Sequence, residues 1–140
     1  MLIDIKTAFI LVGLLYIVLP TVIFYLLKDY THAPVRLWCF GGLLVGSSMI
    51  LLAIRAQYES YLPGFVAFTA SNALMVLGYL FRIQSLRIEL NKPLPPMHIV
   101  WILLSFILIF EILRVVLGVA LIRMCFAYFS ISLLAFWLAI

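Results

Sequence analysis

The sequence predicts an all-α membrane protein, a polytopic transmembrane helix bundle of about five spans that forms one domain over residues 1–140. Hydrophobic residues make up 68% of the chain and charged residues 10%, whereas soluble domains carry about 45–50% apolar and about 25% charged residues. The mean hydropathy is +1.32. A soluble domain of this size cannot bury so much apolar surface, so the lipid bilayer is the expected solvent. The apolar residues also form stretches of bilayer length without the period-two alternation of strands.

Charge-free stretches define the expected spans, because a helix needs about 20 residues to cross about 30 Å of hydrocarbon. Helices are required because no water satisfies the backbone in the bilayer core. Pro20 predicts a kink in the first span. That span is expected to be retained rather than cleaved as a signal peptide, since the preceding residues carry no net positive charge. A turn is expected near Gly118, and the longest polar connection is expected at 82–96. The expected spans are 7–27, 36–55, 63–84, 97–116 and 121–140.

The Lys and Arg residues stand singly at the ends of the apolar runs, a pattern typical of membrane interfaces that argues against nucleic acid as a partner. Five spans place four basic residues on one side of the membrane and five on the other. We expect the chain in a bacterial cytoplasmic membrane, and this excess predicts an N-terminus outside and a C-terminus inside. The side with five carries Lys28, Arg36, Arg82, Arg87 and Lys92, and the other carries Lys6, Arg55, Arg114 and Arg123.

Small residues in the second span form a GxxxG pattern, Gly42 to Gly46, preceded by Gly41. Such a strip lets another helix approach closely, and close packing replaces the hydrophobic drive that is missing in lipid. Two interpretations stay open: packing within the bundle, and a dimerisation face.

Three polar residues in the apolar runs are candidates for a ligand contact or a polar switch. Asn72 lies in the middle of the third span, where its amide needs an interhelical partner such as Ser47 or Ser48, a water molecule or a ligand. Glu111 and Arg114 are spaced i, i+3 and can form an ion pair, with Arg123 as a second partner for Glu111. Two interpretations of this pair stay open. Ionisable residues deep in the membrane usually have a function, whereas residues near the interface can extend their charged groups into water without one.

No residue pattern indicates catalysis, a cofactor or a metal. Cys39 and Cys125 are expected toward opposite membrane faces and lie in no CxxC pair. His32 and His98 fall at span ends, unlike the histidines of a haem-binding bundle. Since no Ser-His-Asp set, phosphate-binding loop or carboxylate pair is present, we expect no enzymatic activity.

A series of short motifs runs through the region from residue 36 to about residue 90. It consists of Arg36-Leu37-Trp38, Gly41, Gly46, Leu52-Ala53-Ile54-Arg55, Leu62-Pro63, Ser71-Asn72-Ala73-Leu74 and Gly78. In this order the motifs resemble the N-terminal multi-helix membrane region of bacterial signalling proteins, in which a GGDEF-type diguanylate cyclase or a histidine kinase domain follows in the cytoplasm. The resemblance implies a sensory role in which the membrane helices pass a signal inward.

The first functional hypothesis is therefore a non-enzymatic membrane sensor or signal-transmission module. The apolar run that reaches Ile140 suggests a fragment of a larger receptor. The alternative is a small structural or accessory subunit that docks on other transmembrane helices, in a homo-oligomer or a larger membrane complex. A small transporter with Glu111 as its coupling carboxylate is a third hypothesis, although inverted repeats are lacking.

Overall fold

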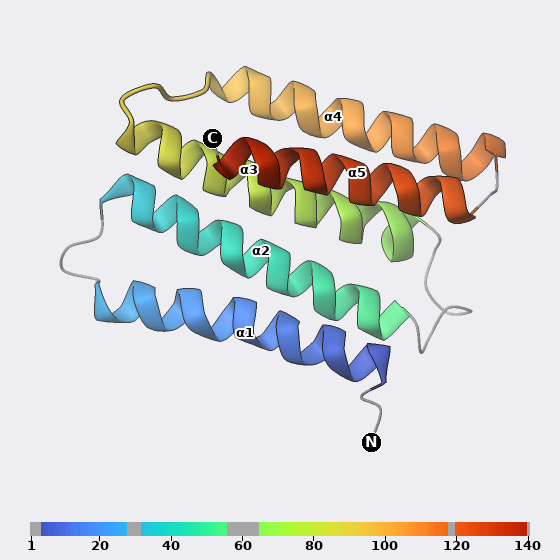
Figure 1. Cartoon of the computed structure of the whole chain (residues 1–140), viewed down its shortest axis with the longest axis horizontal. Helices are drawn as coiled ribbons and strands as arrows, with labels where there is room; N and C mark the ends of the chain where they lie inside the picture. The colour runs from blue at the N-terminus through green and yellow to red at the C-terminus, as the bar shows by residue number, and fades with distance from the viewer. Residues whose placement is uncertain (1–3, 28–31, 56–64, 118–119, 140) are drawn as a thin grey trace.

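The computed structural model describes residues 4–27, 32–55, 65–117 and 120–139, and this part of the chain contains helices and short connections without a strand. The all-α prediction is confirmed. The helices run alternately in opposite directions along one common axis, so α1 begins and α5 ends at opposite ends of the bundle (Figure 1). The elements are α1 (Ile5–Leu26), α2 (Ala33–Arg55), the π-helical segment η2 (Phe65–Ala70), α3 (Ser71–Glu89), α4 (Pro96–Ile112), the π-helical segment η3 (Leu113–Leu117) and α5 (Ala120–Ala139).

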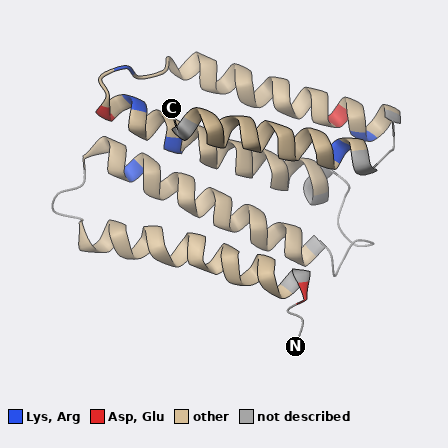
Figure 2. Cartoon of the chain, in the orientation of Figure 1, with Lys and Arg blue, Asp and Glu red and all other residues tan. Residues whose placement is uncertain are grey.

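The outer helices have the length and composition of membrane spans. Thr7–Leu26, Ala33–Ile54 and Pro96–Val116 are long and apolar enough to cross a bilayer, and Ile122–Trp137 is a shorter apolar helix. Their outward side chains include large apolar residues such as Leu15 and Leu26, which are 65% and 71% exposed. The described charged residues lie toward the two ends of the bundle and leave its middle uncharged (Figure 2). This arrangement fits a lipid environment.

The more polar helix α3 occupies the centre of the bundle, where it packs against α2, α4 and α5. Its buried residues include Ser71, Arg82 and Ser85 beside apolar ones. The Ser85 hydroxyl donates to the carbonyl oxygen of Pro34 in the first turn of α2, at 2.7 Å. Because protein rather than lipid covers α3, its polar side chains can find partners on neighbouring helices.

Glycines bring α1, α2 and α3 into close contact. A Cβ on Gly41 would lie 2.6 Å from the Gly78 carbonyl oxygen, and a Cβ on Gly78 would lie 2.7 Å from the Gly41 carbonyl oxygen. On the other side of α2, a Cβ on Gly46 would lie 2.7 Å from the carbonyl oxygen of Gly13. Side chains larger than hydrogen would therefore separate these helices.

The contact among α3, α4 and α5 is built differently, from large side chains. Phe106 stacks on Phe110 and Phe126, with ring centroids 5.7 and 5.5 Å apart. Such offset aromatic contacts add to the packing of apolar surface. The buried core comprises Val76, Leu80, Ile83, Phe106, Phe110, Ala127 and Leu134.

The bounds of the described helices lie within a few residues of the expected apolar runs, except at the end of α3. We expected this helix to end near Gln84, but it continues to Glu89. The predicted connection at 82–96 is thus too long, because its first eight residues are helical. Asn91 ends the helix with φ of 56°, and the N–H of Lys92 donates to the Arg87 carbonyl at 2.8 Å. This is a Schellman cap with Asn in the left-handed position.

Two further expectations concern helix ends and breaks. The helix α1 is continuous through Pro20, whose side chain is buried against the position of Gly42. The expected turn near Gly118 lies outside the described residues.

Cys39 near the start of α2 and Cys125 near the start of α5 lie at opposite ends of the bundle, as expected (Figure 1). Both thiols are free.

Candidate functional site

The first candidate site surrounds Glu111 at the end of α4. Arg114 Nε lies 2.8 Å from Glu111 Oε2, which confirms the expected i, i+3 ion pair. The hydroxyl of Thr69, a fully buried residue of η2, donates to Glu111 Oε1. The side chains of Arg114 and Glu111 are only 27% and 22% exposed. The carboxylate thus joins two elements that are far apart in sequence, with a separate partner for each oxygen.

The two π-helical segments meet at this ion pair. Thr69 lies in η2, which leads into α3, while Arg114 lies in η3, which follows α4 directly. A π-helical turn bonds each carbonyl to the fifth residue onward, is rare, and is found disproportionately at functional sites. Both segments contribute a side chain to Glu111. The polar contact therefore lies where the π-helical segments η2 and η3 meet.

Asn72 belongs to the same end of the bundle, but its partner is not the predicted one. Its Nδ2 donates to the carbonyl oxygen of Phe68 in the preceding turn, at 2.7 Å. Of the two suggested interhelical partners, Ser47 is exposed, and Ser48 is fully buried with no hydrogen-bond partner for its Oγ in the described part of the chain. Asn72 thus satisfies a backbone carbonyl of the π-helical segment. This local role replaces the interhelical bond that the sequence suggested.

Arg123 of α5 does not form the expected second ion pair with Glu111. Its guanidinium carbon lies 4.8 Å from the centre of the Phe68 ring. Its Nε is buried without a hydrogen-bond partner among the described residues. Stacking on an aromatic face compensates for part of the cost of removing a guanidinium from water. Among the described residues, the cluster therefore contains the guanidinium groups of Arg114 and Arg123 and the carboxylate of Glu111.

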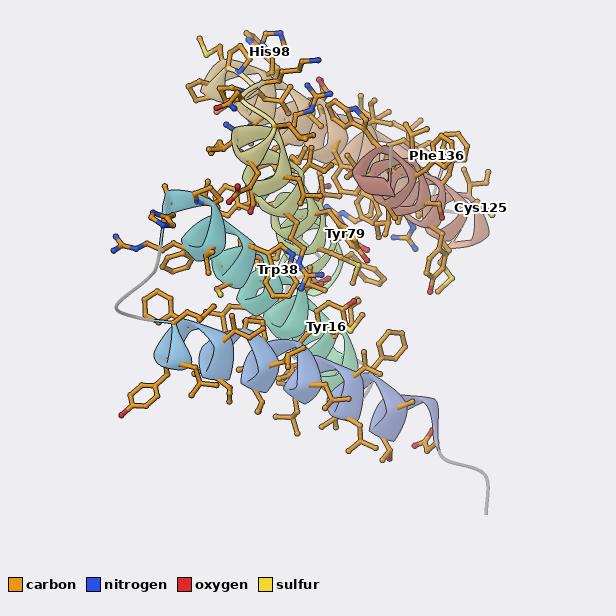
Figure 3. The ribbon with its side chains drawn as sticks, turned by 60° about the vertical axis from the view of Figure 1, so that its left-hand side comes forward. Tyr16, Trp38, Tyr79, His98, Cys125 and Phe136 are labelled. Carbon is orange, nitrogen blue, oxygen red and sulfur yellow. The ribbon has the colours of Figure 1, made fainter. Side chains whose placement is uncertain are left out.

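A second polar group, Arg82, lies toward the opposite end of the bundle, and the sequence did not single it out as a site. Its guanidinium carbon lies 4.9 Å from the centre of the Tyr16 ring and 4.7 Å from that of Trp38. The labelled side chains of Tyr16, Trp38 and Tyr79 gather between α1, α2 and α3 (Figure 3). Arg82 is only 9% exposed, although it was expected in a polar connection. We call Arg82 with Tyr16 and Trp38 the aromatic arginine site.

The expected packing glycines make room for this site. A Cβ on Gly41 would lie 2.9 Å from Arg82 Cγ, and a Cβ on Gly42 would lie 3.1 Å from Arg82 Nη2. Gly46 contacts α1 instead, since its Cβ would lie 2.6 Å from Ile17 Cγ1. All three glycines thus pack within the chain, in agreement with the intrachain interpretation. The sequence offers a local signal for this site, because Tyr79 and Arg82 are spaced i, i+3 and so share a face of α3.

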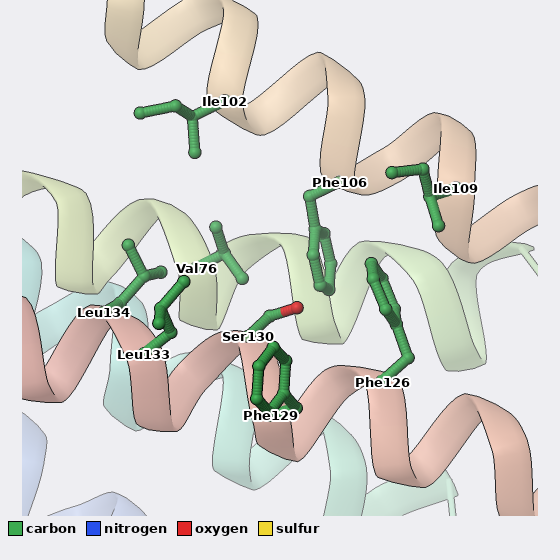
Figure 4. Close-up of a pocket in the computed structure, with 9 residues that line it drawn as sticks. All are labelled: Val76, Ile102, Phe106, Ile109, Phe126, Phe129, Ser130, Leu133 and Leu134. Carbon is green, nitrogen blue, oxygen red and sulfur yellow. The ribbon is translucent and has the colours of Figure 1, made fainter.

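An apolar pocket of about 230 Å³ lies between α3, α4 and α5, and its lining residues are drawn in Figure 4. Ser130 is the polar residue among them. No group of three or more His, Cys, Asp or Glu residues occurs in the part that the structure describes. His32 and His98 are exposed at the starts of α2 and α4.

In the part of the chain that the structure describes, the fold and these sites define an all-α bundle of apolar helices with a charged cluster around Glu111 and a buried arginine, Arg82, toward the other end. The chain has no significant match among protein-family models, curated proteins or solved structures.

Proposed function

We propose that the chain is a membrane-embedded sensor or signal-transmission module whose switching element is the cluster of Thr69, Glu111 and Arg114. The observation that carries the proposal is the bidentate use of Glu111, which accepts from η2 with one oxygen and from Arg114 of η3 with the other. Partly buried ionisable residues within membrane helices are costly to maintain and usually functional.

The two π-helical segments supply a physical means of switching. A π-helical turn holds about one residue more than an α-helical turn, so its conversion would rotate the following helix by roughly 100°. Conversion of η2 would rotate α3, which touches α2, α4 and α5. The bonds to Glu111 hold η2 and η3 in place. Loss of these bonds would therefore allow α3 to rotate along its whole length.

A signal must bind the two arrangements with different affinity in order to shift their populations. An anion that competes with Glu111 for Arg114, or a cation that competes with Arg114 for Glu111, would weaken the ion pair. Either event acts on the bond between α3 and α4 rather than on a catalytic group. Transmission would end at the opposite end of α3, where Arg87 stacks on Trp137 of α5 at 4.8 Å.

We further propose that the chain lies in a bacterial cytoplasmic membrane with the N-terminus outside and the C-terminus inside. Arg36 near the start of α2, Arg87 near the end of α3 and Lys92 in the following connection share the end at which α5 finishes. Cytoplasmic ends of membrane helices carry an excess of Lys and Arg. The basic end of the bundle therefore supports this orientation.

Hydrogen exchange tests the switching role on the full chain in lipid. Glu111→Gln removes the charge and leaves the size unchanged, so the amides of η2 and of the first turns of α3 should exchange faster than in the wild type. Glu89→Gln is the matched control, because Glu89 is an exposed glutamate at the opposite end. Equal protection of η2 in the wild type and in Glu111→Gln would reject the proposal.

A docking role as an accessory subunit is favoured by one observation on α1. Among the described elements only α2 lies close to α1 along its backbone, and the outward faces of α1 expose large apolar side chains. Partner helices, a second copy of the chain or lipid can cover these faces. Purification from native membranes distinguishes the roles, since a stable stoichiometric complex that forms without Glu111 would favour docking over sensing.

A further inference from the structure

Arg82 is a buried cation whose charge no acidic side chain balances in the described part of the chain. It is nine-tenths buried, at 9% exposure. Its Nε is closed off from solvent without a hydrogen-bond partner. The described ion pair of the bundle is that of Glu111 with Arg114, which lies at the other end. A buried charge without a counter-ion is costly, so this position calls for an anion.

The two aromatic rings satisfy only part of what the guanidinium requires. Tyr16 and Trp38 lie within 4.9 and 4.7 Å of its carbon and stabilise the cation through their ring faces. A guanidinium also has five N–H donors directed outward in its own plane. Ring faces accept none of these in-plane donors, and Arg82 Nε has no hydrogen-bond partner among the described residues. An oxyanion accepts two such donors side by side. A bidentate hydrogen-bonded contact from the guanidinium to a phosphate or similar oxyanion would therefore complete the site.

Arg82 lies inside the bundle but near its basic end. It precedes Glu89, the last residue of α3, by seven residues, which corresponds to about 10 Å, or about two turns, along a helix. Trp38 lies close to the start of α2, and tryptophan is common near membrane interfaces. Arg36 and Lys92 lie farther out at the same end and are exposed. Arg82 is thus about two turns from an end of the bundle whose exposed basic side chains attract anions.

We propose that the aromatic arginine site binds a phosphate-class anion through the guanidinium of Arg82, held between α1 and α2. The anion is either the phosphodiester of an anionic lipid headgroup or free inorganic phosphate, since both present the same oxygens. Tyr16 on α1, Trp38 on α2 and Arg82 on α3 come from three helices. Binding therefore fastens these three helices together at the basic end. This role is independent of the switching role proposed for Glu111.

Lipid retention tests the proposal on the purified full chain. The chain is reconstituted with phosphatidylcholine and phosphatidylglycerol, and native mass spectrometry counts the lipids that stay bound. The wild type should retain phosphatidylglycerol in preference to phosphatidylcholine. Arg82→Gln should bind phosphatidylglycerol roughly tenfold or more weakly, because it loses hydrogen bonds to a charged group. Arg36→Gln and Lys92→Gln are matched controls that remove one exposed charge each and should retain the lipid.

A spectroscopic arm keeps the proposal falsifiable if Arg82→Gln fails to fold. Trp101→Phe and Trp137→Phe together leave Trp38 as the sole tryptophan, and neither substitution touches the aromatic arginine site. An anion on the Arg82 guanidinium should change the Trp38 emission. A response to phosphatidylglycerol alone identifies a lipid headgroup, and a response to inorganic phosphate in detergent identifies a free anion. No response to either, or equal lipid retention by Arg82→Gln and the wild type, would overturn the proposal.

Discussion

Thr69 donates its hydroxyl hydrogen to Glu111, a residue 42 positions further along the chain, and so links η2 to the end of α4. The same carboxylate accepts from Arg114 Nε at 2.8 Å. Hydrogen bonds to charged groups are stronger than those between neutral groups. A single carboxylate therefore holds together both π-helical segments of the bundle. The following predictions test this link and the packing around it.

The Thr69 and Glu111 side chains should be energetically coupled. We expect Thr69→Val and Glu111→Ala each to lower the free energy of unfolding, and the double variant to lose less than the sum. The coupling should be roughly 0.5–2 kcal/mol, the range found for hydrogen bonds between membrane helices. Unfolding in a denaturing detergent measures all four free energies of the cycle. Strictly additive losses would show that the two side chains do not stabilise each other.

The contact between α2 and α3 should be intolerant of a methyl group at Gly41. Its Cβ would lie 2.6 Å from the backbone oxygen of Gly78, so Gly41→Ala must push the helices apart. We expect a loss of about 1–3 kcal/mol in the free energy of unfolding, as for other overpacked interfaces. Ser47→Ala is the control, since Ser47 is exposed on the same helix. Thermal unfolding in detergent compares the variants, and equal stability of both would contradict the close approach.

Two buried serines should respond in opposite ways to removal of their hydroxyl groups. Ser85 donates to Pro34 O at 2.7 Å, so Ser85→Ala should lower stability by about 1 kcal/mol. Ser48 Oγ is buried without a described partner, so Ser48→Ala should be neutral or stabilising. The same detergent unfolding assay measures both. A larger loss for Ser48→Ala than for Ser85→Ala would show that these hydrogen-bond assignments are wrong.

The all-α bundle and the approximate places of its helices could be predicted from the sequence because apolar runs of bilayer length have few alternatives in lipid. The end of α3 was missed for a physical reason. Arg82 was treated as an interface residue, although its charge lies between aromatic rings inside the bundle. Asn91 followed by Pro93 was the available signal, since Asn in a left-handed cap with proline after it ends helices.

The candidate site was predictable only where its residues are close in sequence. The ion pair of Glu111 with Arg114 follows from their i, i+3 spacing, because such residues share a helix face. Thr69 contacts the pair from η2. No local sequence pattern tells which face of one helix packs against another, so this contact could not be predicted. Asn72 was correctly expected to need a partner, but the π-helical geometry offered the Phe68 carbonyl within its own helix.

Single cysteines should report the proposed orientation. In a chain with Cys39 and Cys125 replaced, Lys92→Cys should react with a membrane-impermeant thiol reagent only after the cells are opened. Asp4→Cys should react in intact cells, because Asp4 precedes α1 at the other end of the bundle. The two exposed positions control for each other. The reverse labelling pattern would invert the orientation, and labelling of both in intact cells would contradict an odd number of spans.

Distances between spin labels test the switching role of Glu111 most directly. Labels at Phe40→Cys on α2 and Leu86→Cys on α3 occupy exposed positions, with Cys39 and Cys125 replaced. If Glu111 holds η2 in its π-helical form, the full chain in lipid should give one main distance. Glu111→Gln should move the main population to a second distance as α3 rotates, and Thr69→Val should move it in the same direction. Identical distance distributions for the wild type and both variants would contradict the account.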